Sequence, residues 1–188
     1  MDAFSYLSVL LSVILGLAVQ QVLMGYRALA LHRGRIRFYW PSIAWSLVIL
    51  MFAAQHWWAS FGLAGRASWS FADFAAILTE TGFIYMMAAL VFPDVPADGT
   101  LDLKDHYFRE RLPFFAVGSG AVSWSIVREL ILERDLPDPA NLAFHLLFLA
   151  MALIAMRSRS ERLHALFAGA MLALFVVYVT LLFARLGG

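Results

Sequence analysis

Cysteine is absent from this chain of 188 residues. Without thiols the protein forms no disulfide bond, attaches no haem through thioether links and holds no iron–sulfur cluster or thiolate zinc site. The motifs of soluble enzymes are also missing, because no GxSxG, HExxH, P-loop or GxGxxG pattern occurs in a strand–helix context. We therefore expect no bound cofactor, and the sequence favours a protein that is not an enzyme.

Charge is scarce as well. Charged residues make up only 14% of the chain, whereas soluble domains carry about 25%. Hydrophobic residues make up 62%, and the mean hydropathy is +0.77. A soluble fold of this length could not bury so much apolar surface, so we expect the lipid bilayer to be the solvent for much of it. The formal net charge of +1 argues against a nucleic-acid partner, which a basic patch or stripe would indicate.

Long apolar runs dominate the sequence that remains. Runs of about 18–25 residues are typical of transmembrane helices. They are continuous rather than alternating, which argues against the strands of an outer-membrane barrel. The sequence therefore predicts an all-α integral membrane protein, a single domain built as a bundle of six transmembrane helices. The predicted spans are residues 4–26, 40–62, 70–92, 113–132, 140–156 and 163–184.

Basic residues gather in alternate loops of this predicted bundle. Ten of the 14 lie after the first, third and fifth spans, and the others are Arg66, Arg128, Arg134 and Arg185. By the positive-inside rule these three loops are cytoplasmic, which places both termini outside. All but one of the 14 basic residues are arginine. We interpret that bias as a GC-rich bacterial genome, and hence the location as the bacterial cytoplasmic (inner) membrane.

The longest predicted connection is the cytoplasmic loop 93–112. Pro93, Pro96 and Gly99 indicate an irregular turn in its first half, and its second half predicts a short interfacial helix. His106 is then expected to be an exposed loop histidine. One interpretation of the segment is a solvated connector, and the other is a docking surface for a cytoplasmic protein partner.

Small and polar residues recur at helical spacing in the first and fourth spans. Such stripes let helices approach closely, either within the bundle or in a homo-oligomer. Alternatively, they are the walls of a polar passage. Ser12 of the first span and Ser123 of the fourth lie near the estimated depth of Glu80 and would belong to that passage.

Glu80 is a carboxylate inside the apolar run 70–92. It lies about 15 Å from the outer end of its span, near the middle of a bilayer core of about 30 Å. A charge at the centre of a bilayer costs about 2.5–3.5 kcal/mol or more, so we expect Glu80 to face the bundle. Because no cation lies at its estimated depth, we expect Glu80 to be a neutral acid.

Other polar groups form a layer nearer the outside. His56 and His145 lie about 9 Å below the outer boundary and Arg128 about 6 Å below it. We expect Arg128 to pair with Asp73 or with its neighbour Glu129. A metal site made from the two histidines would take Asp73 rather than the deeper Glu80 as its third ligand.

These polar groups support two functional hypotheses. The first is a small proton- or cation-linked transporter or channel that uses the intramembrane carboxylate. Its path would comprise Glu80, Asp73, His56, His145, Arg128, Ser12 and Ser123. The alternative is a non-catalytic membrane subunit or sensor that oligomerises and binds a cytoplasmic partner through loop 93–112. Glu80 would then be a structural hydrogen bond between helices.

Overall fold

The computed structural model describes residues 3–66, 68–94 and 100–182. This part of the chain contains six helices that are long and apolar enough to cross a membrane. Their bounds are α1 Ala3–Leu31, α2 Trp40–Ser60, α3 Phe71–Leu90, α4 Leu103–Leu132, α5 Pro139–Arg157 and α6 Glu161–Leu182. The prediction of a six-helix bundle of membrane-spanning length is confirmed at this level.

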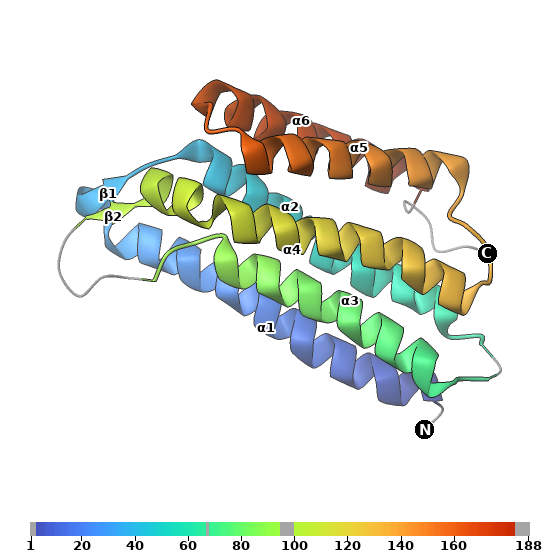
Figure 1. The fold of residues 1–188 in the computed structure, drawn as a ribbon. Helices are drawn as coiled ribbons and strands as arrows, with labels where there is room; N and C mark the ends of the chain where they lie inside the picture. Colours follow the sequence, from blue (N-terminus) through green and yellow to red (C-terminus); the bar gives the residue numbers. More distant parts are fainter. Residues whose placement is uncertain (1–2, 67, 95–99, 183–188) are drawn as a thin grey trace.

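The helices form three layers of two (Figure 1). One outer layer holds α1 and α3, the middle layer holds α2 and α4, and the other outer layer holds α5 and α6. Helix α3 packs along α4, α5 also packs along α4, and α6 packs along α2. The two middle helices barely touch each other, so the space between them is bounded by helices of both outer layers.

Polar and proline residues begin several of the helices. Ser70 and Asp73 form a capping box at the start of α3. Asp102 accepts a hydrogen bond from the backbone N–H of Asp105 and caps α4. Asp138 caps α5 in the same way, followed by Pro139 at the first helical position.

The second half of the predicted loop 93–112 is part of the bundle. Helix α4 begins at Leu103 rather than at residue 113, so the prediction of a connector followed by a separate short helix is wrong there. Pro113 lies inside this helix. Five of the eight residues 104–111 are charged and hide the helix from a hydropathy scan, yet four of these five, Lys104, Arg109, Glu110 and Arg111, are good helix formers at the projecting end of a 30-residue helix. Residues 95–99 of the loop, and residues 183–185 in and beyond the predicted sixth span, lie outside the described residues.

We call the end of the bundle that holds Arg33, Arg35 and Arg157 the basic end. There the short strand β1 (Ile36–Arg37) pairs in parallel with β2 (Leu101–Asp102). The turn η1 (Arg33–Arg35) precedes β1. At the other end, the turn η2 (Phe61–Leu63) follows α2.

Aromatic and histidine side chains close the basic end. Trp45 is 2% exposed and packs edge-on against Phe114, Phe115 and Phe148. His164 is fully buried; its Nε2 donates to the carbonyl of Ser158, so its Nδ1 accepts from the hydroxyl of Tyr107 at 2.9 Å. These contacts leave a filled core at this end.

Burial determines the environments of a histidine and a tyrosine at the basic end. His106 is 7% exposed and donates from Nε2 to the carbonyl of Leu90, so the prediction of an exposed loop histidine is wrong. It is buried because α4 begins early and carries it against the end of α3. Burial, assisted by the negative charge of Glu161, raises the pKa of Tyr39 just before α2 to about 12.

Candidate functional site

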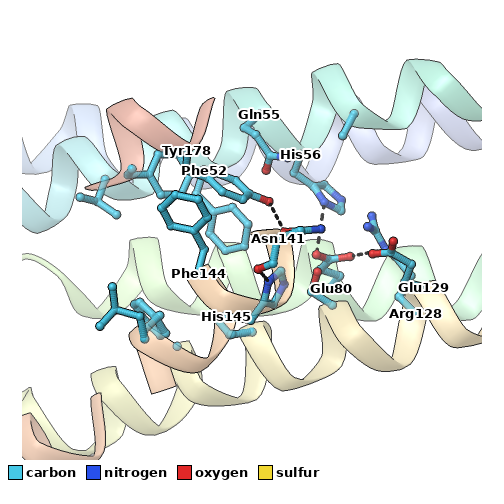
Figure 2. A pocket seen from close by; sticks show the side chains of 18 of the residues that line it. Phe52, Gln55, His56, Glu80, Arg128, Glu129, Asn141, Phe144, His145 and Tyr178 are labelled. Atoms are coloured by element: carbon cyan, nitrogen blue, oxygen red, sulfur yellow. Dashed lines mark hydrogen bonds and ion pairs between the residues drawn. The ribbon is translucent and has the colours of Figure 1, made fainter. Parts of the chain in front are cut away.

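A cavity of about 290 Å³ lies between the two middle helices and the layer of α5 and α6. That volume is near the lower end of small-molecule sites, which span about 300–1,000 Å³. Each of α2, α4, α5 and α6 contributes residues spaced three and four apart, so one face of each helix lines it. Figure 2 shows the polar part of the lining, where side chains from these helices meet Glu80 of α3.

The cavity changes character along its length. It reaches Glu133 at the end away from the basic end, where that side chain is 59% exposed. At its other limit it is lined by Val48, Gly118 and Met171, beyond which the aromatic core of the basic end begins. The cavity is therefore polar near the surface and apolar at depth.

Glu80 and Arg128 form a buried ion pair at the wall of the cavity. Arg128 Nε lies 3.1 Å from Glu80 Oε2, and the side chains are 19% and 3% exposed. Neither atom makes an aligned hydrogen bond in the described part of the chain, so the contact is an ion pair held by charge. The two residues come from adjacent helices α4 and α3, which pack along each other.

The sequence-based expectation that Glu80 has no cation beside it is wrong. Backbone depth placed Arg128 well above Glu80, yet both side chains are long and extend toward each other between α3 and α4. An arginine near a helix end can direct its head inward when a buried carboxylate is there to receive it. Arg128 accordingly pairs with Glu80 rather than with Asp73.

His56 is the third member of the charged cluster, which we define as Glu80, Arg128 and His56. Its Nδ1 lies 3.8 Å from Glu80 Oε1, and the side chain is 1% exposed. The predicted separation of Glu80 from His56 into different layers is therefore also wrong. His56 Nε2 lies 3.0 Å from the hydroxyl of Thr81, one residue after Glu80.

The hydrogen bonds of Thr81 determine which ring nitrogen of neutral His56 carries the proton. The Thr81 hydroxyl donates its proton to the carbonyl of Ile77 at 2.9 Å, so it can only accept from the histidine. Neutral His56 therefore carries its proton on Nε2 and presents the lone pair of Nδ1 toward Glu80. A second proton would bind at Nδ1, directly against the carboxylate.

His145 lies on the α5 side of the cavity and is 8% exposed. Its Nδ1 donates to the carbonyl of Asn141 at 2.7 Å, which leaves the lone pair on Nε2. The side chain of Asn141 also lines the cavity and accepts a hydrogen bond from the hydroxyl of Tyr178 at 3.1 Å. These contacts hold α5 to α6 at the polar part of the cavity.

Four of the aromatic residues that line the cavity, Phe52, Phe144, Phe175 and Tyr178, form what we call the aromatic wall. Phe175 connects to Phe52 and Tyr178 with ring centroids 6.1 and 5.7 Å apart. Tyr178 stacks edge-on against Phe144 at 5.1 Å. In Figure 2 the labelled members of this wall lie to one side of Asn141 and His145, and the charged cluster lies to the other.

Two further carboxylates line the cavity. Glu133 lies 3.7 Å from Arg66, which also contacts Asp73 at 3.6 Å. The side chain of Glu129 forms no ion pair or hydrogen bond with any of the described residues, although the charge of Arg128 acts on it. With both histidines neutral, the lining holds three carboxylates and one guanidinium, a formal charge of −2.

The predicted path residues divide into two groups. The structure brings Glu80, His56, His145 and Arg128 to the cavity. Asp73 instead belongs to the capping box of α3, where its carboxylate accepts from the backbone N–H of Ser70, and it does not line the cavity. Ser12 and Ser123 are exposed on the outer faces of α1 and α4, away from the cavity.

The metal alternative is not supported by the placement of its ligands. No group of three histidine, aspartate or glutamate side chains among the described residues could hold a metal ion. His56 and His145 both line the cavity, whereas Asp73 belongs to the contact with Arg66 outside it.

Several lining residues carried no signal of function in the sequence. The phenylalanines of the aromatic wall lie in apolar runs, where they are ordinary core components, and Asn141 stands at the start of such a run. The spacing of Asn141, His145 and Phe148 at four and three residues is a helical stripe that could have indicated a common face. What spacing could not show is that this face meets a cavity.

No protein-family model, curated protein or solved structure matches this chain. What the cavity can bind therefore follows from the side chains that line it.

Proposed function

We propose that this chain is a small proton-linked transporter that carries a solute through the cavity between α2 and α4. The observation that carries the proposal is the buried charged cluster, with Glu80 2% exposed at the wall of a 290 Å³ cavity. Buried ionisable groups are expensive in a membrane-spanning bundle and commonly mark ion or proton pathways. A free cation channel is less favoured, because Arg128 already balances the charge of Glu80.

Proton coupling is supported by the geometry at His56. The Nδ1 lone pair faces Glu80 Oε1 at 3.8 Å, so a proton on His56 would form a second ion pair with the same carboxylate. Glu80 would then be shared between Arg128 and His56, and its hold on Arg128 would weaken. Binding or release of one proton can thus change the arrangement of the cavity wall.

The orientation of the protein is part of the proposal. The basic end would face the cytoplasm of a bacterium and both chain termini would lie outside, by the positive-inside rule. The described conformation would then be open to the outside through the polar end of the cavity and closed inside by the core around Trp45 and His164. Transport would require this core to open.

The test is solute-dependent proton movement in proteoliposomes. Purified protein is reconstituted with trapped pyranine, and amines, carboxylates and neutral solutes are added one class at a time. We expect one class to move protons in vesicles containing the wild type but not in protein-free vesicles. His56→Gln should reduce this movement, while Glu110→Gln on the far end of α4 should not. No proton movement with any class would contradict the proposal.

The alternative role, a subunit or sensor that docks a cytoplasmic partner through residues 93–112, has less surface available than the sequence implied. Leu103, His106 and Tyr107 of that segment are buried within the bundle. We therefore favour the transporter. A stable complex in pull-downs that is lost when residues 93–102 are replaced would instead support the alternative.

A further inference from the structure

The formal charge of the cavity lining indicates the sign of the charge on its ligand. Glu80, Glu129 and Glu133 outnumber Arg128 in the lining. Glu80 is already paired with Arg128, and Glu133 lies near Arg66. The side chain of Glu129 forms no ion pair within the described residues, although Arg128 and His145 act on it electrostatically, and an arriving cation could therefore pair with it.

The aromatic wall also favours a positively charged ligand. Aromatic ring faces attract ammonium groups, and they do so most strongly where water is excluded. Phe52, Phe144, Phe175 and Tyr178 come from α2, α5 and α6, whereas Glu80 and Glu129 come from α3 and α4. A ligand in the cavity would thus lie between rings on one side and carboxylates on the other (Figure 2).

The deep part of the cavity indicates what else the ligand carries. Below the charged cluster the lining is apolar and includes Val48, Met87, Val122, Phe148 and Met171. A small inorganic cation would leave this part unfilled and would lose its hydration shell without gaining oxygen ligands. A hydrocarbon group attached to the cation would fill it.

The geometry points to a small lipophilic organic cation as the ligand of this cavity. Its ammonium group would lie between Glu129 and the aromatic wall, with its hydrocarbon part directed toward Val48 and Met171. This inference rests on the proposed function, since it names the solute class of the same cavity. A carboxylate ligand is disfavoured by the formal charge of the lining, and a neutral one gains nothing from Glu129.

A cationic ligand also defines the direction of coupling. A proton on His56 and an ammonium group in the cavity would place two cations against the same set of carboxylates. They would therefore compete, and each would promote release of the other. The expected cycle is an exchange of protons for organic cations.

Equilibrium dialysis of the purified protein in detergent tests the ligand class. The probe is radiolabelled benzyltrimethylammonium, compared with neopentylbenzene, its uncharged isostere, and with the anion 3-phenylpropionate, each corrected with protein-free micelles. We expect the cation to bind about tenfold more tightly than either comparison compound, or better, as one cation–π contact and one carboxylate would provide. Equal or tighter binding of the neutral or anionic compound would overturn the inference.

Variants locate the binding site. Glu129→Gln should lower the affinity for benzyltrimethylammonium and leave neopentylbenzene unaffected. Phe175→Leu should lower the affinity for the cation by about tenfold while keeping the carboxylates intact. Glu110→Gln, a matched control on the same helix α4, should bind like the wild type. Unchanged cation binding in both cavity variants, each checked for folding by circular dichroism, would overturn the assignment.

The failure of this inference can be separated from the failure of the proposed transport. Selective cation binding without proton movement in proteoliposomes would leave the ligand class standing and remove the transport role. Proton movement driven by a carboxylate or a neutral solute, with no selective cation binding, would do the reverse. Exchange driven only by organic cations would support both.

Discussion

At the scale of single residues, the cavity wall depends on a carboxylate and a guanidinium that share a poorly solvated space. Glu80 is 3% exposed in its side chain and Arg128 19%. Removing one partner of such a pair leaves the other charge without compensation, which costs about 3–5 kcal/mol. Removing both replaces the pair by neutral amides and avoids most of that cost.

We therefore predict that Arg128→Gln lowers the stability of the folded protein by about 3 kcal/mol. The double variant Glu80→Gln with Arg128→Gln should recover most of the loss. Thermal unfolding in detergent, followed by circular dichroism, measures both. A double variant that is no more stable than the single one would show that the two side chains are not coupled. Arg66→Gln is the control, because its ion pairs are longer and partly exposed, and it should cost less than about 1 kcal/mol.

The position of Glu80, His56, His145 and Arg128 inside the bundle could be predicted from sequence, because ionisable residues are conspicuous inside apolar runs. Their partners could not. The contact between Arg128 and Glu80 depends on how far two long side chains reach between packed helices, and the proton on His56 depends on a hydroxyl of Thr81. Ser12 and Ser123 share the estimated depth of Glu80 but lie on outward faces, which depth alone cannot distinguish.

At the scale of the helices, close packing of α1 depends on Gly25, because the ring of Phe92 occupies the space that a larger side chain would need. A methyl group added at Gly25 would overlap the ring of Phe92, which follows α3. Gly16 of the same helix has open space around it. We predict that Gly25→Ala destabilises the bundle by about 1–3 kcal/mol through overpacking.

Gly16→Ala is the matched control. It should be neutral or stabilising by about 0.5–1 kcal/mol, because alanine reduces the backbone entropy lost on forming a helix. Melting temperatures of the two variants in the same detergent give the comparison. Equal effects of the two substitutions would contradict the packing described for α1.

The cap of α4 gives a prediction that depends on pH. Burial would raise the pKa of Asp102, but hydrogen bonds from the Asp105 N–H and from Arg37, together with the charge of Arg37, lower it overall. Asp102→Ala should cost about 1 kcal/mol at neutral pH. Because the folded pKa is lowered, this contribution is present above the ordinary aspartate range and is lost as the pH falls through the folded pKa.

The measurement for Asp102 is the difference in melting temperature between the wild type and Asp102→Ala at several pH values. The difference should be constant near neutrality and shrink as the pH drops below about 4. A difference that grows on acidification would show that the carboxylate does not stabilise α4 in its charged form.

The helices themselves were predictable to different degrees. Five of them follow their apolar runs closely, because a continuous run long enough to cross a bilayer has few other solutions than a helix. The start of α4 was not predictable in this way. Residues 103–112 are rich in charge, and they are helical because they continue the axis of α4 beyond the apolar part and pack Leu103 and Tyr107 inward.

At the scale of the whole molecule, three layers leave the two middle helices apart, and that separation creates the cavity (Figure 1). Sequence patterns predict each helix separately and do not show which helices pack together, so the separation of α2 and α4 could not be predicted from them. The sidedness of the bundle, in contrast, is a sequence-based expectation that can be tested directly.

The natural absence of cysteine makes that test simple. Gly34→Cys lies at the basic end and Gly65→Cys at the other, and both positions have open space for a side chain. A membrane-impermeant maleimide added to intact bacterial cells should label Gly65→Cys and leave Gly34→Cys unlabelled until the membrane is opened. The reverse pattern would invert the proposed orientation.

The central claim is that Glu80 couples protons to solute movement, and the most direct measurement is solute-driven proton flux in proteoliposomes containing Glu80→Gln. We expect this variant to insert and fold, verified by circular dichroism and by the double variant with Arg128→Gln, and to lose the flux of the wild type. Glu80→Asp should retain part of it, since it keeps an ionisable carboxyl group. Flux in Glu80→Gln equal to that of the wild type would contradict the account.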